Sequence, residues 1–480
     1  VINIITREHA PKLFNADANL SYGSFNTINA AANLSGSGNN FGYLINYGYE
    51  ASNGISEAQD PANNDFDRDG INSNTLFTKF YYEPVNGLTI TPSFNYSFFE
   101  SDFDGGSFTD ANNDLSLELI NPSLNARYRQ GSLEVNALYG YTETTNAFFS
   151  PTGSTPFKAE GRAQNADLFA SGYLTGRMQL LGGFAWQRFE TLGNTGGFDA
   201  DILSPYATFF YRNYDGLNAE LGIRFNNHTE FGSELTYNIS PSYNILIGND
   251  VLDDIKLQAS FSTGFRAPTL NDLFGPFGSN VNLQPEKSPS IDASITTNLL
   301  SKKLKISLLY FNRHIDNLIQ FSAADGFLVN VNRQEDQGIE SSVTYRLNRK
   351  YQLSAFYNWL DGKQIIDASG NEVSNLIRRP ENRLGFTLNA QPLSGLSGNL
   401  QWIYSSSRND LFFDPATFAQ SEVNLDPYHL VNIFLEYSIS QTGISIFGDL
   451  RNLLDQDYNE VVGFNTPGIH GNLGIRIRLN

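Results

Sequence analysis

The chain has 480 residues, among them 37 Phe, 24 Tyr, 41 Gly and no Cys, and its formal net charge is −19. Without cysteine it can hold neither a disulfide scaffold nor a thiolate metal site. An acidic chain without a basic tract is a poor binder of nucleic acid, so we expect no nucleic-acid partner. No stretch approaches the ~18 apolar residues that a membrane helix needs, and no linker divides the chain.

Short segments in which apolar and polar residues alternate follow one another along the whole chain, which predicts β-strands. The clearest of them span 43–49, 76–82, 88–98, 304–310, 397–405 and 444–450. Short turns such as 83–87 and 129–131 alternate with longer polar loops such as 54–74 and 100–113. This succession is typical of a barrel that crosses an outer membrane with its strands. Helical periodicity is scarce and predicts one turn at most, over 269–274.

The end of the chain shows what the alternation means. Leu473, Ile475, Ile477 and Leu479 share one face of a predicted strand, and Arg476 and Arg478 lie on the other face. A soluble protein would bury the apolar face in a core, whereas a membrane barrel turns it to lipid and turns the arginines to a wet lumen. We find no fixed repeat of the kind that propellers and β-helices show. The sequence therefore predicts an all-β fold, a transmembrane antiparallel β-barrel of about 22 strands.

Five motifs, in family order, resemble those of TonB-dependent outer-membrane receptors. They are 1–6 (VINIIT), 265–268 (FRAP) with 282–288 (NLQPEKS), 338–340 (GIE), 378–380 (RRP) and 452–458 (NLLDQDY). The first resembles the last strand of the plug domain that precedes the barrel in this family. By this resemblance, residues 1–7 are the last strand of a plug domain that is otherwise absent from the chain, and 8–480 are the transmembrane β-barrel domain. Members usually end on an aromatic residue, whereas this chain ends on Leu479-Asn480, which leaves open whether Asn480 is the true C-terminus.

The resemblance implies a location in the bacterial outer membrane and active uptake of a scarce, bulky solute. The implied partners are outer-membrane lipid, a plug domain, a TonB-type energy transducer and a small-molecule ligand. We see no catalytic constellation in the sequence, so we do not expect an enzyme. Two alternatives are a passive porin, which usually has ~16–18 strands, and a structural outer-membrane subunit.

The resemblance leaves the solute open between cobalamin and an iron siderophore. Cobalamin receptors are the members of the family that the chain most resembles. The family's haem receptors carry a histidine after the FRAP motif, but the stretch 269–282 has none, and the whole chain has only five. Haem iron needs a strong axial ligand, and zinc prefers His or Cys donors. The sequence therefore disfavours haem and zinc as solutes.

Two acidic loops resemble those that bind calcium in the cobalamin receptors of this family. The first contains 65–70 (DFDRDG), and the second runs from 102 to 114. Matching them position by position implies calcium at Asp67, Asp69, Asp104 and Asp114. Independently of the resemblance, carboxylates held close together repel one another unless a cation lies among them, and calcium takes six to eight oxygen ligands.

The match is incomplete near Ser56, where the cobalamin receptors carry an Asp, and either Glu57 or Asp60 could substitute. An EF-hand is a second interpretation of the first loop. It fails because Leu76 stands where an EF-hand needs a bidentate Glu, and because no helices flank the loop. A solvated acidic loop without a metal is the third interpretation, and the sequence does not decide between it and a calcium site.

Overall fold

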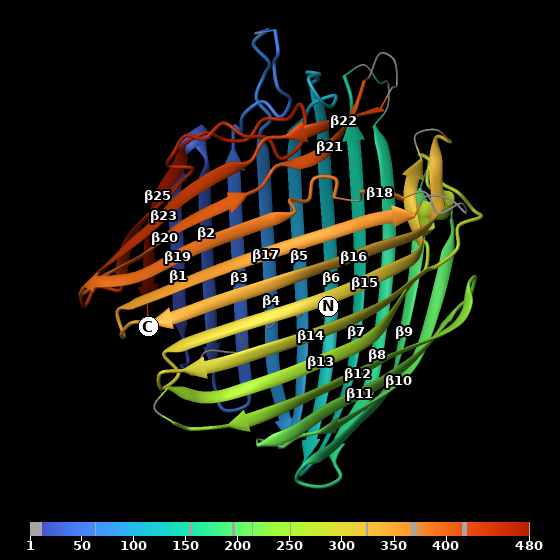
Figure 1. Cartoon of the computed structure of the whole chain (residues 1–480), viewed down its shortest axis with the longest axis vertical. Coiled ribbons are helices and arrows are strands. Elements are labelled where there is room, and N and C mark those ends of the chain that lie inside the picture. Colours follow the sequence, from blue (N-terminus) through green and yellow to red (C-terminus); the bar gives the residue numbers. More distant parts are fainter. Residues whose placement is uncertain are drawn as a thin grey trace.

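The computed structural model describes residues 12–479 apart from 63, 152, 154–155, 194–196, 214, 250, 323–324, 366–371, 375 and 415–419. Within these residues the chain forms one closed, antiparallel β-barrel of 22 strands, in which β1 pairs with both β2 and β25 (Figure 1). The expected all-β fold and strand number are confirmed. The expected plug strand, residues 1–7, lies outside the described residues.

Most strands are long enough to extend well beyond a membrane core. The barrel strands are β1 (Asn15–Gly23), β2 (Ile28–Ser37), β3 (Phe41–Ser52), β4 (Ile71–Val85), β5 (Leu88–Phe103), β6 (Asn113–Gln130), β7 (Leu133–Phe149), β8 (Phe157–Tyr173), β9 (Met178–Gly193), β10 (Asp199–Tyr211), β11 (Gly216–His228), β12 (Gly232–Leu246), β13 (Leu252–Arg266), β14 (Glu286–Leu299), β15 (Leu304–Ser322), β16 (Phe327–Arg346), β17 (Tyr351–Ile365), β19 (Asn382–Leu393), β20 (Leu396–Ser405), β23 (Tyr428–Ile439), β24 (Ile444–Arg451) and β25 (His470–Leu479). The short elements are η1 (Ser24–Asn26), α1 (Leu270–Phe274), β18 (Glu372–Ser374), β21 (Arg408–Phe413) and β22 (Gln420–Leu425).

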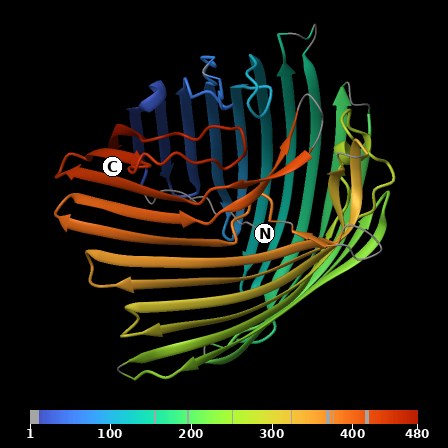
Figure 2. The same cartoon turned by 45° about the horizontal axis from the view of Figure 1, so that its top comes forward.

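The two halves of the chain form opposite walls. Figure 2 shows the strands of the N-terminal half facing those of the C-terminal half across the barrel. The β21–β22 hairpin pairs only within itself among the described strands, and β18 pairs antiparallel with the end of β17. None of the helices in the described part of the chain has the length and apolar character needed to cross a membrane.

The predicted faces of the last strand are confirmed. Leu473, Ile475, Ile477 and Leu479 are 41–71% exposed on the outer surface. On the other face Arg476 donates to Glu436 at 2.8 Å. Register pairs Ile475 with Leu20 of β1, so the apolar outer row continues across the closing seam of the barrel.

Glycines on the inner wall let aromatic rings lie flat against neighbouring strands. A Cβ at Gly338 would lie 2.6 Å from the ring of Phe311 and 2.6 Å from the carbonyl oxygen of Trp359. Rings of Phe356 and Phe447 cover Gly385 and Gly474 in the same way. This close approach explains the glycine of the GIE motif, because any side chain there would displace the ring.

The strands next to the acidic loops extend further than the sequence indicated. β5 runs to Phe103 and β6 starts at Asn113, so the predicted loop 100–113 shrinks to 104–112. Polar residues continue the ladder there, with Asp102 paired to Asp114. Apolar alternation is the signal that marked the strands in the sequence, so polar strand ends of this kind escape it. The single helical turn is confirmed as α1, whose N-cap is Thr269.

Candidate functional site

Three loops and the β21–β22 hairpin meet at the end of the barrel that carries the long connections (Figure 1). We call 53–70 the first acidic loop, 104–112 the second acidic loop and 452–469 the last loop. The loops are joined by hydrogen bonds between backbone groups and by bonds from polar side chains of one loop to backbone groups of another.

The last loop lies against both acidic loops. Its Asn465 donates from the side chain to the carbonyl oxygens of Ser56 and Ala58, at 3.0 and 2.7 Å. The carbonyl oxygen of Gly463 accepts from the backbone N–H groups of Gln59 and Phe108, at 2.9 and 3.2 Å. Gly463 has a φ of +78°, and a Cβ there would lie 2.6 Å from Ser107, so this contact requires glycine.

The hairpin is attached to the same group of loops through a fully buried carboxylate. Asp410 accepts from Arg378 Nε at 2.6 Å and from the backbone N–H groups of Leu411 and Val462, each at 2.7 Å. Phe412 of the hairpin packs edge-on against Phe108 of the second acidic loop at a ring distance of 5.8 Å. Asp410 therefore joins the hairpin, the RRP motif and the last loop.

We expect Asp410→Ala to release the last loop from the hairpin. The Val462 N–H loses a charged acceptor, a type of bond that contributes about 1.5–3 kcal/mol. Hydrogen exchange at Val462 should then accelerate about 10-fold to 100-fold. Asp426→Ala is the control, since Asp426 is exposed and, like Asp410, lies in the connection between β20 and β23. Unchanged exchange at Val462 would show that Asp410 does not hold the loop.

The two acidic loops bring three carboxylates together. Carboxylate oxygens of Asp67, Asp104 and Asp110 all lie within 4.8 Å of one another. Asp104 is buried, and its oxygens accept from the backbone N–H groups of Ala58 and Ala111 at 2.7 and 3.0 Å. Asp67 and Asp110 are exposed. The group is therefore a fixed buried carboxylate flanked by two that solvent reaches.

Asp69 is electrostatically part of this group. Its carboxylate accepts from the backbone N–H of Glu57 at 2.5 Å. The pKa of Asp69 is raised to about 6, chiefly by partial burial and also by the negative charges of Asp104, Asp67 and Glu57, whereas the bond from the Glu57 backbone acts in the opposite direction. Such a shift means that negative charge is unfavourable at this place, which a bound cation would relieve.

The two residues that could complete the first acidic loop lie in different surroundings. Glu57 accepts from the backbone N–H of Asp104 at 3.2 Å, so it lies beside the acidic group. Asp60 instead accepts from the backbone N–H groups of Ala62 and Asp65 at 3.0 and 2.9 Å, which closes a turn within its own loop. Asp110, which the sequence analysis did not single out, is the carboxylate that joins Asp67 and Asp104.

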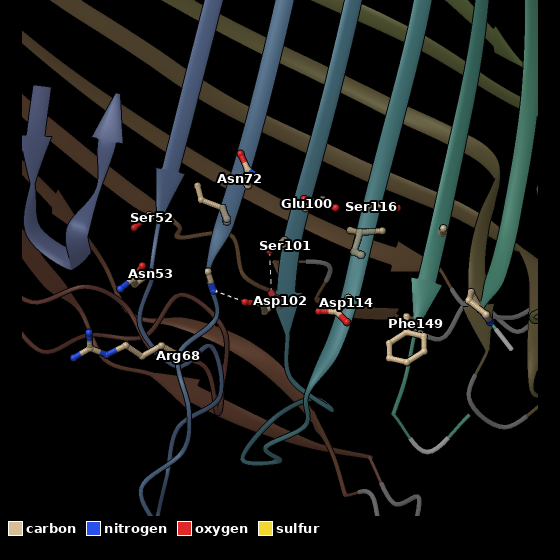
Figure 3. A pocket seen from close by; sticks show the side chains of 15 residues that line it. Ser52, Asn53, Arg68, Asn72, Glu100, Ser101, Asp102, Asp114, Ser116 and Phe149 are labelled. Carbon is tan, nitrogen blue, oxygen red and sulfur yellow. Dashed lines mark hydrogen bonds between the residues drawn. The ribbon is translucent and has the colours of Figure 1, made fainter. Parts of the chain in front are cut away.

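Asp114 lies with a different set of side chains. It pairs with Asp102 across β5 and β6, and both share the outer face with Glu100. These carboxylates line an outer groove of about 860 Å³ (Figure 3), together with Arg68 and Phe149. Register thus directs Asp114 to the outside of the barrel, away from the Asp67–Asp104–Asp110 group.

The FRAP and NLQPEKS motifs meet at one arginine. Arg266 Nη1 donates to the buried Glu286 at 2.8 Å, and Arg266 Nη2 approaches Asp272 at 3.5 Å. Asp272 in turn forms a capping box with Thr269 at the start of α1. These motif residues therefore hold the connection between β13 and β14 in place rather than presenting free side chains to a ligand.

The RRP motif binds two buried aspartates. Arg378 pairs with Asp410, and Arg379 Nη1 lies 3.3 Å from Asp336 on the inner face of β16. Arg313 of β15 also pairs with Asp336, at 2.5 Å. The segment after β18 is thereby attached to the barrel wall and to the hairpin at once.

Comparison with known proteins places this geometry in a family. The family model described as "TonB dependent receptor-like, beta-barrel" matches residues 13–453. The "Vitamin B12 transporter BtuB" of Photobacterium profundum is 26% identical over 422 residues, covering 85% of this chain and 64% of that protein. The protein of the same name from Vibrio cholerae serotype O1 (strain ATCC 39541) is 27% identical over 248 residues, 51% of this chain and 37% of that protein. The chain therefore spans less than two thirds of the length of these curated relatives.

Solved structures share the fold. The ferric enterobactin receptor PfeA of Pseudomonas aeruginosa superposes with a TM-score of 0.80 at 16% identity, covering 98% of this chain and 81% of that one. The siderophore receptor PirA of Acinetobacter baumannii gives a TM-score of 0.81 at 14% identity, covering 99% and 82%. Barrels of this kind are outer-membrane proteins. Because the family model extends over most of the chain, the chain belongs to the TonB-dependent receptor β-barrel family.

Proposed function

We propose that the chain is the outer-membrane barrel of a receptor for active, TonB-dependent uptake of cobalamin. The observation that carries the proposal is the match to vitamin B12 transporters over 85% of the chain. The grouping of Asp67 and Asp104, two of the residues that the resemblance indicated, supports it. In this proposal the end with the long loops faces outwards and meets the solute first.

The barrel supplies the wall and the outer binding surface in this mechanism. Transport is vectorial, because the solute binds outside and is released inward when a plug domain is pulled by an energy transducer. Energy enters through the plug, so the barrel has no bond-breaking step to perform. The inner wall, with its rings seated on glycines and its buried ion pairs, suits a rigid cylinder around a moving plug.

The proposal is tested by binding and by uptake with the natural protein in its own cells. We expect purified protein to bind cyanocobalamin in equilibrium dialysis, and we expect uptake to stop when the energy transducer is deleted. A chain that binds ferric enterobactin but not cyanocobalamin would identify a siderophore receptor instead. That alternative is kept because the structural neighbours named above are siderophore receptors. Solute flux that continues without the transducer would identify a passive porin.

We further propose that calcium binds between the acidic loops. The proposed ligands are Asp67, Asp69 and Asp104, joined by Asp110, which lies within reach of the first and third. Asp114 would have to turn inward to join them, because register directs it to the outer face beside Asp102. A cation here would link the two loops, and loops already ordered lose less entropy when they bind a solute.

Calcium titration tests this proposal. We expect the wild-type protein to bind calcium with measurable heat, and we expect Asp67→Asn and Asp110→Asn each to weaken binding at least about tenfold, because each removes a charged oxygen ligand. Both residues are exposed, so these variants should fold. Asp65→Asn in the same loop is the control and should change affinity by less than about twofold. No heat in the wild type would favour a solvated acidic loop without metal.

A further inference from the structure

We propose that a cavity beneath the FRAP segment binds an uncharged ring or short apolar group that carries one hydrogen-bond acceptor. The cavity measures about 460 Å³ and lies between the inner wall of β7–β11 and residues 267–273. That the bound group belongs to the transported solute rests on the proposed function. The existence of the binding site itself does not depend on the proposed function.

The lining of the cavity is mainly apolar. The wall contributes Ala163, Phe189, Ala200 and Ile202. Pro268 of the FRAP motif and Leu270 and Leu273 of α1 close the cavity from the other side. Arg162 and Glu190 border the space, but Arg162 pairs with Glu143 at 2.9 Å and Glu190 pairs with Arg188 at 3.2 Å. Glu230 is exposed at the edge. An uncharged apolar group therefore suits this lining best, since Arg162 and Glu190 are already paired and Glu230 lies at the exposed edge, outside the apolar part of the lining.

One buried polar side chain that lines the cavity has a ring nitrogen with no hydrogen bond to a described residue. His228 is 5% exposed and lines the space. Its Nδ1 accepts from the backbone N–H of Glu230 at 3.0 Å, so the neutral ring carries its proton on Nε2. Within the described part of the chain no hydrogen bond from Nε2 is present. Nε2 is not among the enclosed atoms that lack a partner, so solvent in the cavity reaches it, and a ligand acceptor that enters the cavity can take the place of that water.

The roof of the cavity is held before any ligand arrives. Arg266 is fixed by Glu286, and Thr269 caps α1. At the end of α1, Phe274 stacks on Phe198 with ring centroids 3.9 Å apart and an angle of 10°. Since the roof is already in place, binding a small group does not have to order a loop, which reduces the entropy lost on binding.

Aromatic rings lead along the inner rim towards this place. Phe277, just after α1, contacts Phe157 at 5.4 Å, Phe157 contacts Phe148 at 6.2 Å, and Phe148 contacts Phe103 at 6.4 Å. Register puts Phe148 opposite Phe157, next to each other on the inner face of β7 and β8. A flat apolar group meeting this row can stack before it reaches the cavity.

A matched pair of probes tests the site directly. We expect 6-bromoquinoline soaked into crystals of the natural protein to give an anomalous bromine peak in the cavity, with the ring nitrogen at hydrogen-bond distance from His228 Nε2. The isosteric 2-bromonaphthalene lacks the acceptor and should bind about threefold to tenfold more weakly, which corresponds to one hydrogen bond. The position of the bromine peak distinguishes probe bound in the cavity from probe that has partitioned into the detergent around the protein.

Two variants make the result decisive. His228→Phe should remove the preference for quinoline, and Ala163→Leu, which places a larger side chain in the cavity, should exclude both probes. His429→Phe is the control, because His429 packs between Trp402 and Tyr404 away from the cavity. Equal occupancy by the two probes, an unchanged preference in His228→Phe, or no bromine in the cavity because a plug side chain already fills it would overturn the proposal. Whether the wild-type protein binds and takes up cobalamin is measured separately, by equilibrium dialysis and by uptake in cells, so failure here is distinguishable from failure of the proposed function.

Discussion

Replacing Arg313 and Arg379 together by Met should lower the free energy of unfolding by about 3–5 kcal/mol, because it removes both arginine partners of a buried carboxylate. The Asp336 side chain is 0% exposed and pairs with both arginines, and Gln334 donates to it at 2.9 Å. Equilibrium unfolding in urea, followed by refolding into lipid vesicles, measures the difference. The loss should be larger than for either single variant, since one arginine still neutralises the carboxylate.

Two comparisons identify the cause. Arg333→Met removes ion pairs with Asp316 and Glu335 in which all the partners are partly exposed to solvent, so it should cost less than about 1 kcal/mol. Adding Asp336→Asn to the double variant should restore most of the lost stability, because a neutral amide needs no counter-charge. A double variant as stable as Arg333→Met would show that Asp336 does not need its arginines.

What the sequence could predict was the part of the structure set by short-range periodicity. In a strand the side-chain period is two, so Ile475 and Arg476 can be assigned to opposite faces from their order alone. Chain length then gave the strand number, because each strand with its connections uses a similar share of residues. The one-turn helix at α1 was indicated by periodicity too, and the structure adds that Thr269 and Asp272 form a capping box at its start.

Contacts between distant segments were beyond the reach of the sequence. Nothing near Arg378 and Arg379 indicates that they bind Asp410 and Asp336, which lie 32 and 43 positions away. The motif was recognised, but its physical role depends on how the segment folds back on the barrel. Gly463 likewise became explicable only when Ser107 was found beside it.

The acidic loops show the same limit at finer scale. Asp67 and Asp104 were singled out by matching loop to loop, and the structure brings them together. Asp110 was not singled out because its place depends on how a short loop closes between β5 and β6. Asp114 was grouped with the others by the same match to the cobalamin receptors, but β6 begins before it, so the pleat and not the loop decides where its side chain points.

An arginine placed on the outer face of the barrel should test whether that face meets lipid. Ile295 lies in the middle of the outer row of β14, 40% exposed, between Leu257 and Leu308 on the neighbouring strands. Ile295→Arg should lower the free energy of unfolding from lipid vesicles by about 2–4 kcal/mol, because a guanidinium in the hydrocarbon core loses its hydration.

Ser294→Arg is the matched control. Ser294 is the next residue on the same strand but faces the lumen, where water can solvate the new charge, so its cost should stay within about 1 kcal/mol. Equal losses for the two variants would mean that the two faces of β14 meet the same solvent, and the assignment of the apolar outer row to lipid would be wrong.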